Sequence, residues 1–164
     1  MRWIARLVQN VLALRRTKNY DIFLSICLAA ITAVVATELV NFLIYLYPSL
    51  IPEGLSAINE SLRESDGSML LTFLVAVCVI APILEELVFR GALWWLLEKF
   101  LPTNAVWIIT SILFAMAHID ILHVIAVFPL GALFGYLRKK TGSIWAPMIA
   151  HATNNILASL TLIF

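Results

Sequence analysis

The sequence predicts an all-α, polytopic membrane protein: a bundle of about five transmembrane helices preceded by an amphipathic interfacial helix. Of its 164 residues, 62% are hydrophobic and only 13% are charged, whereas soluble domains contain about 45–50% apolar and about 25% charged residues. The apolar runs lack the alternation typical of barrel strands, so we expect helices that satisfy their own backbone groups. The length fits one integral membrane domain, 1–164.

The expected elements follow in order along the chain. Residues 1–20 space arginines among apolar side chains at helical intervals, which indicates an interfacial helix. The run 22–47 is too long for a cleavable signal segment and predicts a retained first span. A loop rich in Pro, Gly and Ser follows. Residues 69–164 are then expected to form a core of about four spans, at about 69–97, 104–118, 121–137 and 144–164.

The distribution of charge predicts the orientation. Basic residues precede the first span, whereas the loop 48–68 carries four acidic residues and one arginine. The positive-inside rule therefore places the N-terminus in the cytoplasm. By the same count the basic turn "RKKTG" lies on the cytoplasmic side, although it was not used to set the topology. The net charge of +1 argues against nucleic-acid binding. Cys27 and Cys78 lie in apolar runs and indicate neither a disulfide framework nor a thiolate metal site.

Polar side chains within the predicted spans are the candidate functional residues, because an ionisable group in mid-membrane costs at least a few kcal/mol. Asp120 and His123 lie near an outer turn, where local polar satisfaction is expected of them, and Glu38 is expected near the outer interface as a snorkelling or packing residue. The candidates are Glu38, Glu85, Glu86, Arg90, His118, Asp120, His123, His151, Asn154 and Asn155.

Counting residues from the turn near 100–103 places Glu85 and His118 at the same depth, roughly 22 Å from that turn. A carboxylate can take a proton from water, and an imidazole can orient the water or return the proton. His151 and Asn155 share a helical face and offer donors for an oxyanion. The same counting leaves His151 nearer the cytoplasm than Glu85, unless the chain before Pro147 descends in extended form.

Arg90 follows Glu86 by four residues, so Glu86 is its expected helical partner. This spacing predicts two different roles for the adjacent glutamates. Glu85 is left free for chemistry, and Glu86 holds an ion pair. The reverse assignment is the alternative.

Three motifs in order resemble the CPBP family, which contains the type II CAAX prenyl proteases and bacteriocin-processing enzymes and is also called the Abi family. "EELVFR" at 85–90 matches E-E-x-x-x-R, "FAMAH" at 114–118 matches F-x-x-x-H, and "HATNN" at 151–155 matches H-x-x-x-N. The resemblance plausibly extends over about 70–160. It implies an all-α intramembrane endopeptidase that acts on a membrane-associated or, less surely, a prenylated peptide or protein.

By position in these motifs, the resemblance implies that Glu85 activates water with His118 as its partner. His151 and Asn155 would stabilise the oxyanion, with Glu86 and Arg90 in support. The resemblance does not decide between a metalloprotease and a glutamate protease. We expect no cofactor, because using Glu85 as a zinc ligand would leave only Glu86 as a base; the zinc alternative takes Glu85, His118 and His151 as ligands.

The resemblance also implies an integral protein of a prokaryotic plasma membrane, with lipid and a peptide or protein substrate as partners and no nucleic acid. Two other functions use the same polar cluster. One is a non-catalytic immunity or regulatory protein, and the other is an ion or proton carrier.

Overall fold

The computed structural model describes residues 11–51, 60, 64, 66–118 and 120–163, and every regular element among them is helical. The all-α prediction is therefore confirmed. The predicted interfacial helix falls largely on residues 1–10, which lie outside the described residues. The elements are α2 (Asn19–Leu46), η1 (Pro48–Leu50), α4 (Gly67–Val75), η2 (Ala76–Ile80), α5 (Ala81–Glu86), η3 (Leu87–Leu93), α6 (Trp94–Leu97), α7 (Thr103–Met116), α8 (Ile121–Thr141) and α9 (Trp145–Ile163).

Three of the described helices are long and apolar enough to cross a membrane: Asn19–Leu46, Gly67–Leu97 and Ile121–Thr141. The second comprises α4 to α6 and their two intervening segments in one continuous helix of 31 residues. Helix α7 is apolar but has only 14 residues, and α9 has 19 residues. Five helical segments thus occupy the five predicted stretches, but only three meet the length and apolarity of a span by themselves.

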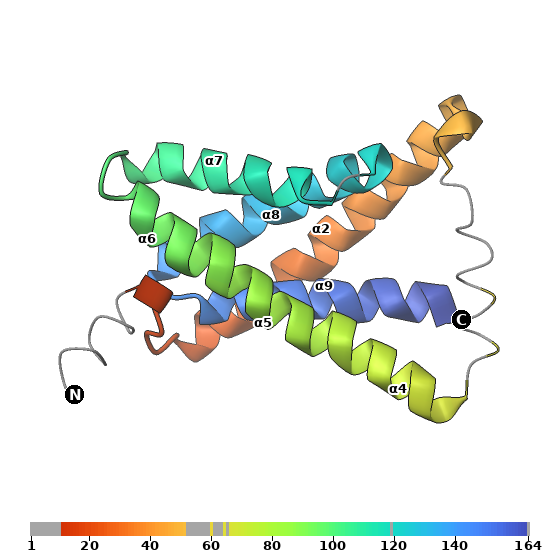
Figure 1. Cartoon of the computed structure of the whole chain (residues 1–164), viewed down its shortest axis with the longest axis horizontal. Helices are drawn as coiled ribbons and strands as arrows, with labels where there is room; N and C mark the ends of the chain where they lie inside the picture. The colour runs from red at the N-terminus through yellow and green to blue at the C-terminus, as the bar shows by residue number, and fades with distance from the viewer. Residues whose placement is uncertain (1–10, 52–59, 61–63, 65, 119, 164) are drawn as a thin grey trace.

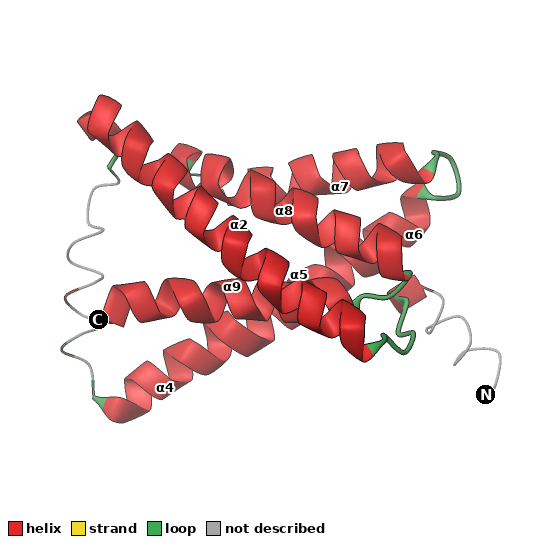
Figure 2. Cartoon of the chain, turned by 180° about the vertical axis from the view of Figure 1, so that it is seen from behind, coloured by secondary structure: helices red, strands yellow, loops and turns green. Residues whose placement is uncertain are grey.

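The helices form a crossed bundle rather than a set of parallel rods (Figure 1). Helices α7 and α8 make an antiparallel hairpin, and α2 runs obliquely across α8 and α9, with which it is in contact (Figure 2). Half of the apolar window of α8 is buried, against 17% for α2 and 11% for Gly67–Leu97. Helix α8 is therefore the central helix, and the other two turn most of their apolar surface outward, as lipid-facing helices do.

Small residues let α7 and α8 approach closely. A Cβ atom at Gly135 would collide with the ring of Trp107, and one at Gly131 would lie 3.2 Å from the backbone oxygen of Ser111. The Trp107 indole donates to the backbone oxygen of Ala132 over 2.8 Å, so the indole nitrogen is satisfied within the contact. The hairpin therefore places the Phe114 and His118 end of α7 against the middle of the bundle.

Local signals begin and end the helices. Asp66 accepts a hydrogen bond from the backbone nitrogen of Met69 over 2.7 Å and so caps α4. That bond, together with one from the Ser68 hydroxyl, holds the pKa of Asp66 below its usual value. Gly142 ends α8 with a φ of 66°, the left-handed conformation that favours glycine at this position. The connection to α9 is short, and Pro147 lies in the first turn of that helix.

Candidate active site

The long helix Gly67–Leu97 changes its hydrogen bonding on both sides of the two glutamates. Segments η2 (Ala76–Ile80) and η3 (Leu87–Leu93) are π-helical and flank α5, which carries Glu85 and Glu86. Pro82 lacks a backbone N–H, so a regular α-helical bond to the residue four positions earlier cannot form there. At the end of η2, the N–H of Ala81 donates to the backbone oxygen of Ala76. Such π segments occur frequently at functional sites.

Asn155 of α9 uses a carbonyl that this irregular segment leaves available. In a regular α-helix the N–H of Ala81 would bond to Val77, but here it bonds to Ala76. The side-chain nitrogen of Asn155 donates to the Val77 oxygen instead, over 2.8 Å. Asn154 in turn donates to the Asn155 side-chain oxygen over 3.1 Å. Asn155 therefore fixes α9 against the helix that carries the glutamates.

Glu86 lies between a cation and an imidazole. Its Oε1 accepts a hydrogen bond from Arg90 Nη1 over 3.0 Å, and His151 Nδ1 lies 3.1 Å from the same oxygen. The Glu86 and Arg90 side chains are both fully buried. The predicted pairing of Glu86 with Arg90 is therefore confirmed, although η3 replaces a regular α-helix between them.

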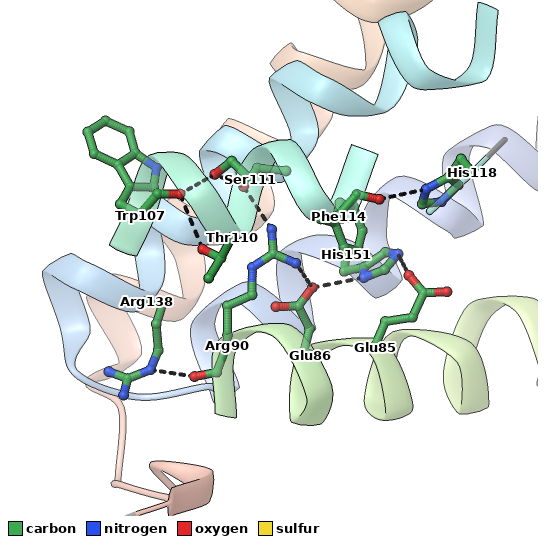
Figure 3. Close-up of polar contacts among 11 residues, drawn as sticks. Glu85, Glu86, Arg90, Trp107, Thr110, Ser111, Phe114, His118, Arg138 and His151 are labelled. Carbon is green, nitrogen blue, oxygen red and sulfur yellow. Dashed lines mark hydrogen bonds and ion pairs between the residues drawn. The ribbon is translucent and has the colours of Figure 1, made fainter. Parts of the chain in front are cut away.

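Arg90 is held by several further contacts. Its Nη2 donates to the backbone oxygen of Gly131 over 2.8 Å, and its guanidinium carbon lies 4.3 Å from the centre of the Phe114 ring. Its own backbone oxygen accepts a hydrogen bond from Arg138 Nε over 2.9 Å. Arg90 thus connects the glutamate helix to α7 and α8, and its charge partly balances the two carboxylates (Figure 3).

Glu85 turns toward the same imidazole from the other side. Its Oε2 lies 3.8 Å from His151 Nε2. This oxygen is buried and has no hydrogen-bond partner among the described residues. A separation of 3.8 Å exceeds hydrogen-bond length but is short enough for one water molecule to contact both atoms. Figure 3 shows the two glutamates and His151 pointing toward one another.

The His151 ring is held rigidly by aromatic neighbours. It stacks on Phe134, with 4.8 Å between ring centres and 22° between the planes, and it meets the edge of Phe114 at 5.5 Å. Because Nδ1 faces the Glu86 carboxylate, we assign the hydrogen of the neutral ring to Nδ1. Nε2 is then directed at Glu85.

His118 lines the same cavity as Glu85 but does not contact its carboxylate. Its Nδ1 lies 3.0 Å from the backbone oxygen of Phe114, and its ring centre is 5.1 Å from that of His123. Among the described residues it forms no hydrogen bond or ion pair with Glu85, for which His151 is the nearer imidazole. Counting residues along the helices did not predict that the Glu85 carboxylate faces His151.

A cavity of about 320 Å³ brings the predicted residues together. Glu85, His118, His151 and Asn155 all line it, whereas Glu86 and Arg90 lie buried behind it. Its remaining lining residues are Phe73, Val77, Ala81, Phe114, His123, Val127, Leu130, Phe134, Asn154, Ala158 and Ser159.

Three polar residues outside the predicted catalytic set also line the cavity: His123, Asn154 and Ser159. Asp120 does accept a hydrogen bond from the backbone nitrogen of His123 over 3.0 Å, as local satisfaction requires, but the His123 ring lines the cavity. Ser159 contacts Cys78 with 3.5 Å between oxygen and sulfur. Their position near an outer turn was the only prediction for Asp120 and His123, and no spacing in the sequence indicates that His123 lines the cavity.

The zinc alternative does not fit the described side chains. Among the residues that the structure describes, no group of three or more His, Cys, Asp or Glu side chains is placed to hold a metal ion. Of the proposed ligands, Glu85 and His151 face each other, while His118 is directed to the Phe114 backbone through Nδ1. We therefore derive no step through a metal.

Comparison with known proteins identifies the family to which the chain belongs. Residues 67–157 match the family described as "Type II CAAX prenyl endopeptidase Rce1-like", a stretch that covers more than half of the chain. The chain belongs to the Rce1-like family. The match includes all three motifs from which the relationship was predicted, so that prediction is confirmed.

The Rce1-like chain is also similar to a curated protein of Bacillus subtilis (strain 168) named "Putative membrane peptidase YdiL". The two are 29% identical over 82 residues, which is 50% of this chain and 34% of the relative. The match thus spans about a third of the relative's length. No solved structure matches the chain. Family and helices together identify an integral membrane protein of a protease family.

Proposed function

We propose that the protein is an intramembrane endopeptidase in which Glu85 activates a water molecule to hydrolyse a peptide bond. The observation that carries this proposal is the position of Glu85 Oε2, buried in a helix-lined cavity and 3.8 Å from His151 Nε2. A buried carboxylate oxygen without a hydrogen-bond partner is costly for folding. A catalytic role explains why this unpaired oxygen lies beside an imidazole, because both groups can then exchange protons with a substrate or a water molecule.

In the proposed reaction, the Glu85 carboxylate takes a proton from water while the water oxygen bonds to the carbonyl carbon of the substrate. The tetrahedral intermediate then loses its amine, and the proton passes to the leaving nitrogen. His151 can share this proton with Glu85, because Glu86 supports positive charge on the ring from the Nδ1 side. Arg90 limits the excess negative charge of the two carboxylates.

The oxyanion needs donors at the edge of the same cavity. Asn155 has two side-chain N–H groups, and the bond to Val77 uses one of them. We propose that the other donates to the oxyanion, together with a protonated His118 or His151. Because Asn155 is held at a fixed point of η2, this donor is positioned before the substrate arrives.

We propose a mechanism without a metal cofactor. The proposal is supported by the directions of the Glu85, His118 and His151 side chains, which do not converge as three metal ligands do. The general base is then the carboxylate itself.

The substrate is proposed to be a membrane-associated peptide or protein, and a prenylated peptide or protein is the alternative. A second cavity of about 540 Å³ lies between α2, α8 and α9 and shares lining residues with the first, so the two are adjacent. Apolar residues form most of its wall, which suits an extended apolar segment entering from the lipid. The shared residues are His123, Val127, Leu130, Asn154 and Ala158.

We further propose a prokaryotic plasma membrane with the N-terminus in the cytoplasm. The proposal is supported by the basic residues that precede α2 and by those at the C-terminal end of α8. Both positions lie at the same end of the bundle (Figure 1).

The direct test is cleavage of a library of membrane-protein fragments by the purified full chain, followed by mass spectrometry of the products. The proposal predicts new peptide termini that appear in proportion to enzyme and time. A binding or carrier protein would produce no cleavage. Labelling of single cysteines introduced at Glu60 and Lys139 tests the orientation, since the two positions should react from opposite sides.

A further inference from the structure

A third cavity, which is polar, lies at the end of the bundle away from the C-terminal end of α9 (Figure 1). It has a volume of about 390 Å³ and is formed where the α6–α7 turn, the C-terminal end of α8 and the segment before α2 meet (Figure 1). Three cations line it, Arg15, Arg138 and Lys139, against one carboxylate, Glu98. None of these cations forms a salt bridge with a carboxylate of the described residues. The cavity therefore has an excess of positive charge.

Hydrogen-bond donors other than the cations also line this cavity. Trp94 is fully buried, and its indole nitrogen has no acceptor among the described residues. Thr103 lies at the N-terminus of α7, where no side chain caps the first turn. The backbone N–H groups of such a turn and the helix dipole favour an anion. Several donors and few acceptors predict a ligand that supplies oxygen atoms and negative charge.

Arg138 is the fixed element of the cavity wall. It is only 8% exposed, its Nε donates to the Arg90 backbone oxygen over 2.9 Å, and its guanidinium carbon lies 5.3 Å from the centre of the Trp94 ring. These contacts orient the guanidinium without neutralising its charge. A guanidinium held in this way is suited to bidentate contact with phosphate oxygens.

The position of the cavity relative to the membrane indicates which class of anionic ligand can reach it. It lies at the ends of Gly67–Leu97 and Ile121–Thr141, two helices long enough to cross a bilayer. The end of a span lies near the lipid headgroups. Trp95 also lines the cavity, and tryptophan is enriched at this level of membranes. A phosphate located here belongs most naturally to a phospholipid.

We propose that this cavity binds the phosphate of an anionic phospholipid, with Arg15, Arg138 and Lys139 as its charged contacts. The site is separate from the proteolytic cavity, and the proposal does not depend on Glu85 chemistry. The two sites are connected through Arg90: Arg138 donates a hydrogen bond to the Arg90 backbone oxygen, and the Arg90 side chain pairs with Glu86. Bound lipid would therefore stabilise the helices that position the two glutamates.

The test titrates lipid into the purified full chain in detergent and follows thermal unfolding. Phosphatidylglycerol is compared with phosphatidylcholine of the same acyl chains and with inorganic phosphate. The variant is Arg15→Gln/Lys139→Gln, which leaves the structural Arg138 in place. The matched control is Lys140→Gln, because Lys140 neighbours the cavity residues but pairs with Asp21 at 3.6 Å. Stabilisation is measured as the rise in melting temperature above that of the same protein without lipid.

We expect phosphatidylglycerol to stabilise the wild type more than either comparison ligand. The double variant should weaken its apparent affinity about tenfold or more, and the control less than about threefold. Equal stabilisation by the two lipids, or an equal loss in the control, would overturn the site. If inorganic phosphate matches phosphatidylglycerol at the same concentration, the cavity takes a soluble anion and the lipid assignment is wrong.

Discussion

Glu86 and Arg90 form an ion pair from which water is excluded, with 3.0 Å between Oε1 and Nη1 and both side chains fully buried. Arg90→Leu removes the cation and leaves the buried Glu86 carboxylate with the His151 ring as its remaining polar contact. We expect a loss of about 3–5 kcal/mol in the free energy of unfolding, measured by denaturant titration in mixed micelles.

Lys99→Leu is the control for this prediction. Lys99 lies in the turn directly after the same helical run, where it is exposed, and its Nζ is 3.4 Å from the centre of the Trp95 ring. Its removal should cost no more than about 1 kcal/mol. Similar losses of unfolding free energy in the two variants would show that the buried pair contributes no more to stability than an exposed lysine.

His151→Asn tests the imidazole that faces Glu85. Asparagine retains a donor near the position of Nδ1, so the contact with Glu86 can persist, but it removes the atom at Nε2 that lies 3.8 Å from Glu85. We expect kcat for peptide cleavage to fall by about 10²–10⁴. The same substitution at His123, whose ring forms no ion pair with a carboxylate among the described residues, should cost less than about tenfold. Comparable losses at the two histidines would remove His151 from the proton transfer.

Asn155→Leu tests the link between α9 and the irregular segment η2. Without the side-chain N–H the Val77 carbonyl loses a donor that lies 2.8 Å away. A buried acceptor left unsatisfied costs about 1–3 kcal/mol, so the melting temperature should fall. Asn154→Leu removes only a bond to another side chain and should destabilise less. The reverse order would contradict the role given to Asn155.

Removal of metal should leave the proposed reaction intact. The protein is dialysed exhaustively against a chelator, checked by elemental analysis, and assayed in metal-free buffer. We expect peptide cleavage at the rate of the untreated enzyme. Activity that disappears with the metal and returns with added zinc would contradict a carboxylate acting on water by itself.

The sequence predicted the features that depend on spacing along one helix. The interval from Glu86 to Arg90 is four residues, and the pair forms in the structure. The apolar runs predicted the helices, and the three motifs predicted the family.

Contacts between helices were predicted less well, because they depend on crossing angles and irregular turns. Depth counting assumed straight, regular helices perpendicular to the membrane. It therefore paired Glu85 with His118, whereas the imidazole nearest the Glu85 carboxylate is His151. The π segments on both sides of α5 turn the following side chains relative to a regular α-helix, which residue counting does not include. Nor does any spacing indicate that Arg138 bonds to the backbone of Arg90, since 48 residues separate them.

The central claim is that Glu85 is the base that activates water, and cleavage of one defined peptide by Glu85→Gln tests it most directly. Glutamine preserves the size of the side chain and removes its ability to accept a proton. Glu64→Gln, an identical change at an exposed loop position, is the control, and melting temperatures confirm that all proteins are folded. We predict that kcat falls by about 10²–10⁴ in Glu85→Gln alone. Cleavage by Glu85→Gln at the wild-type rate would contradict the mechanism.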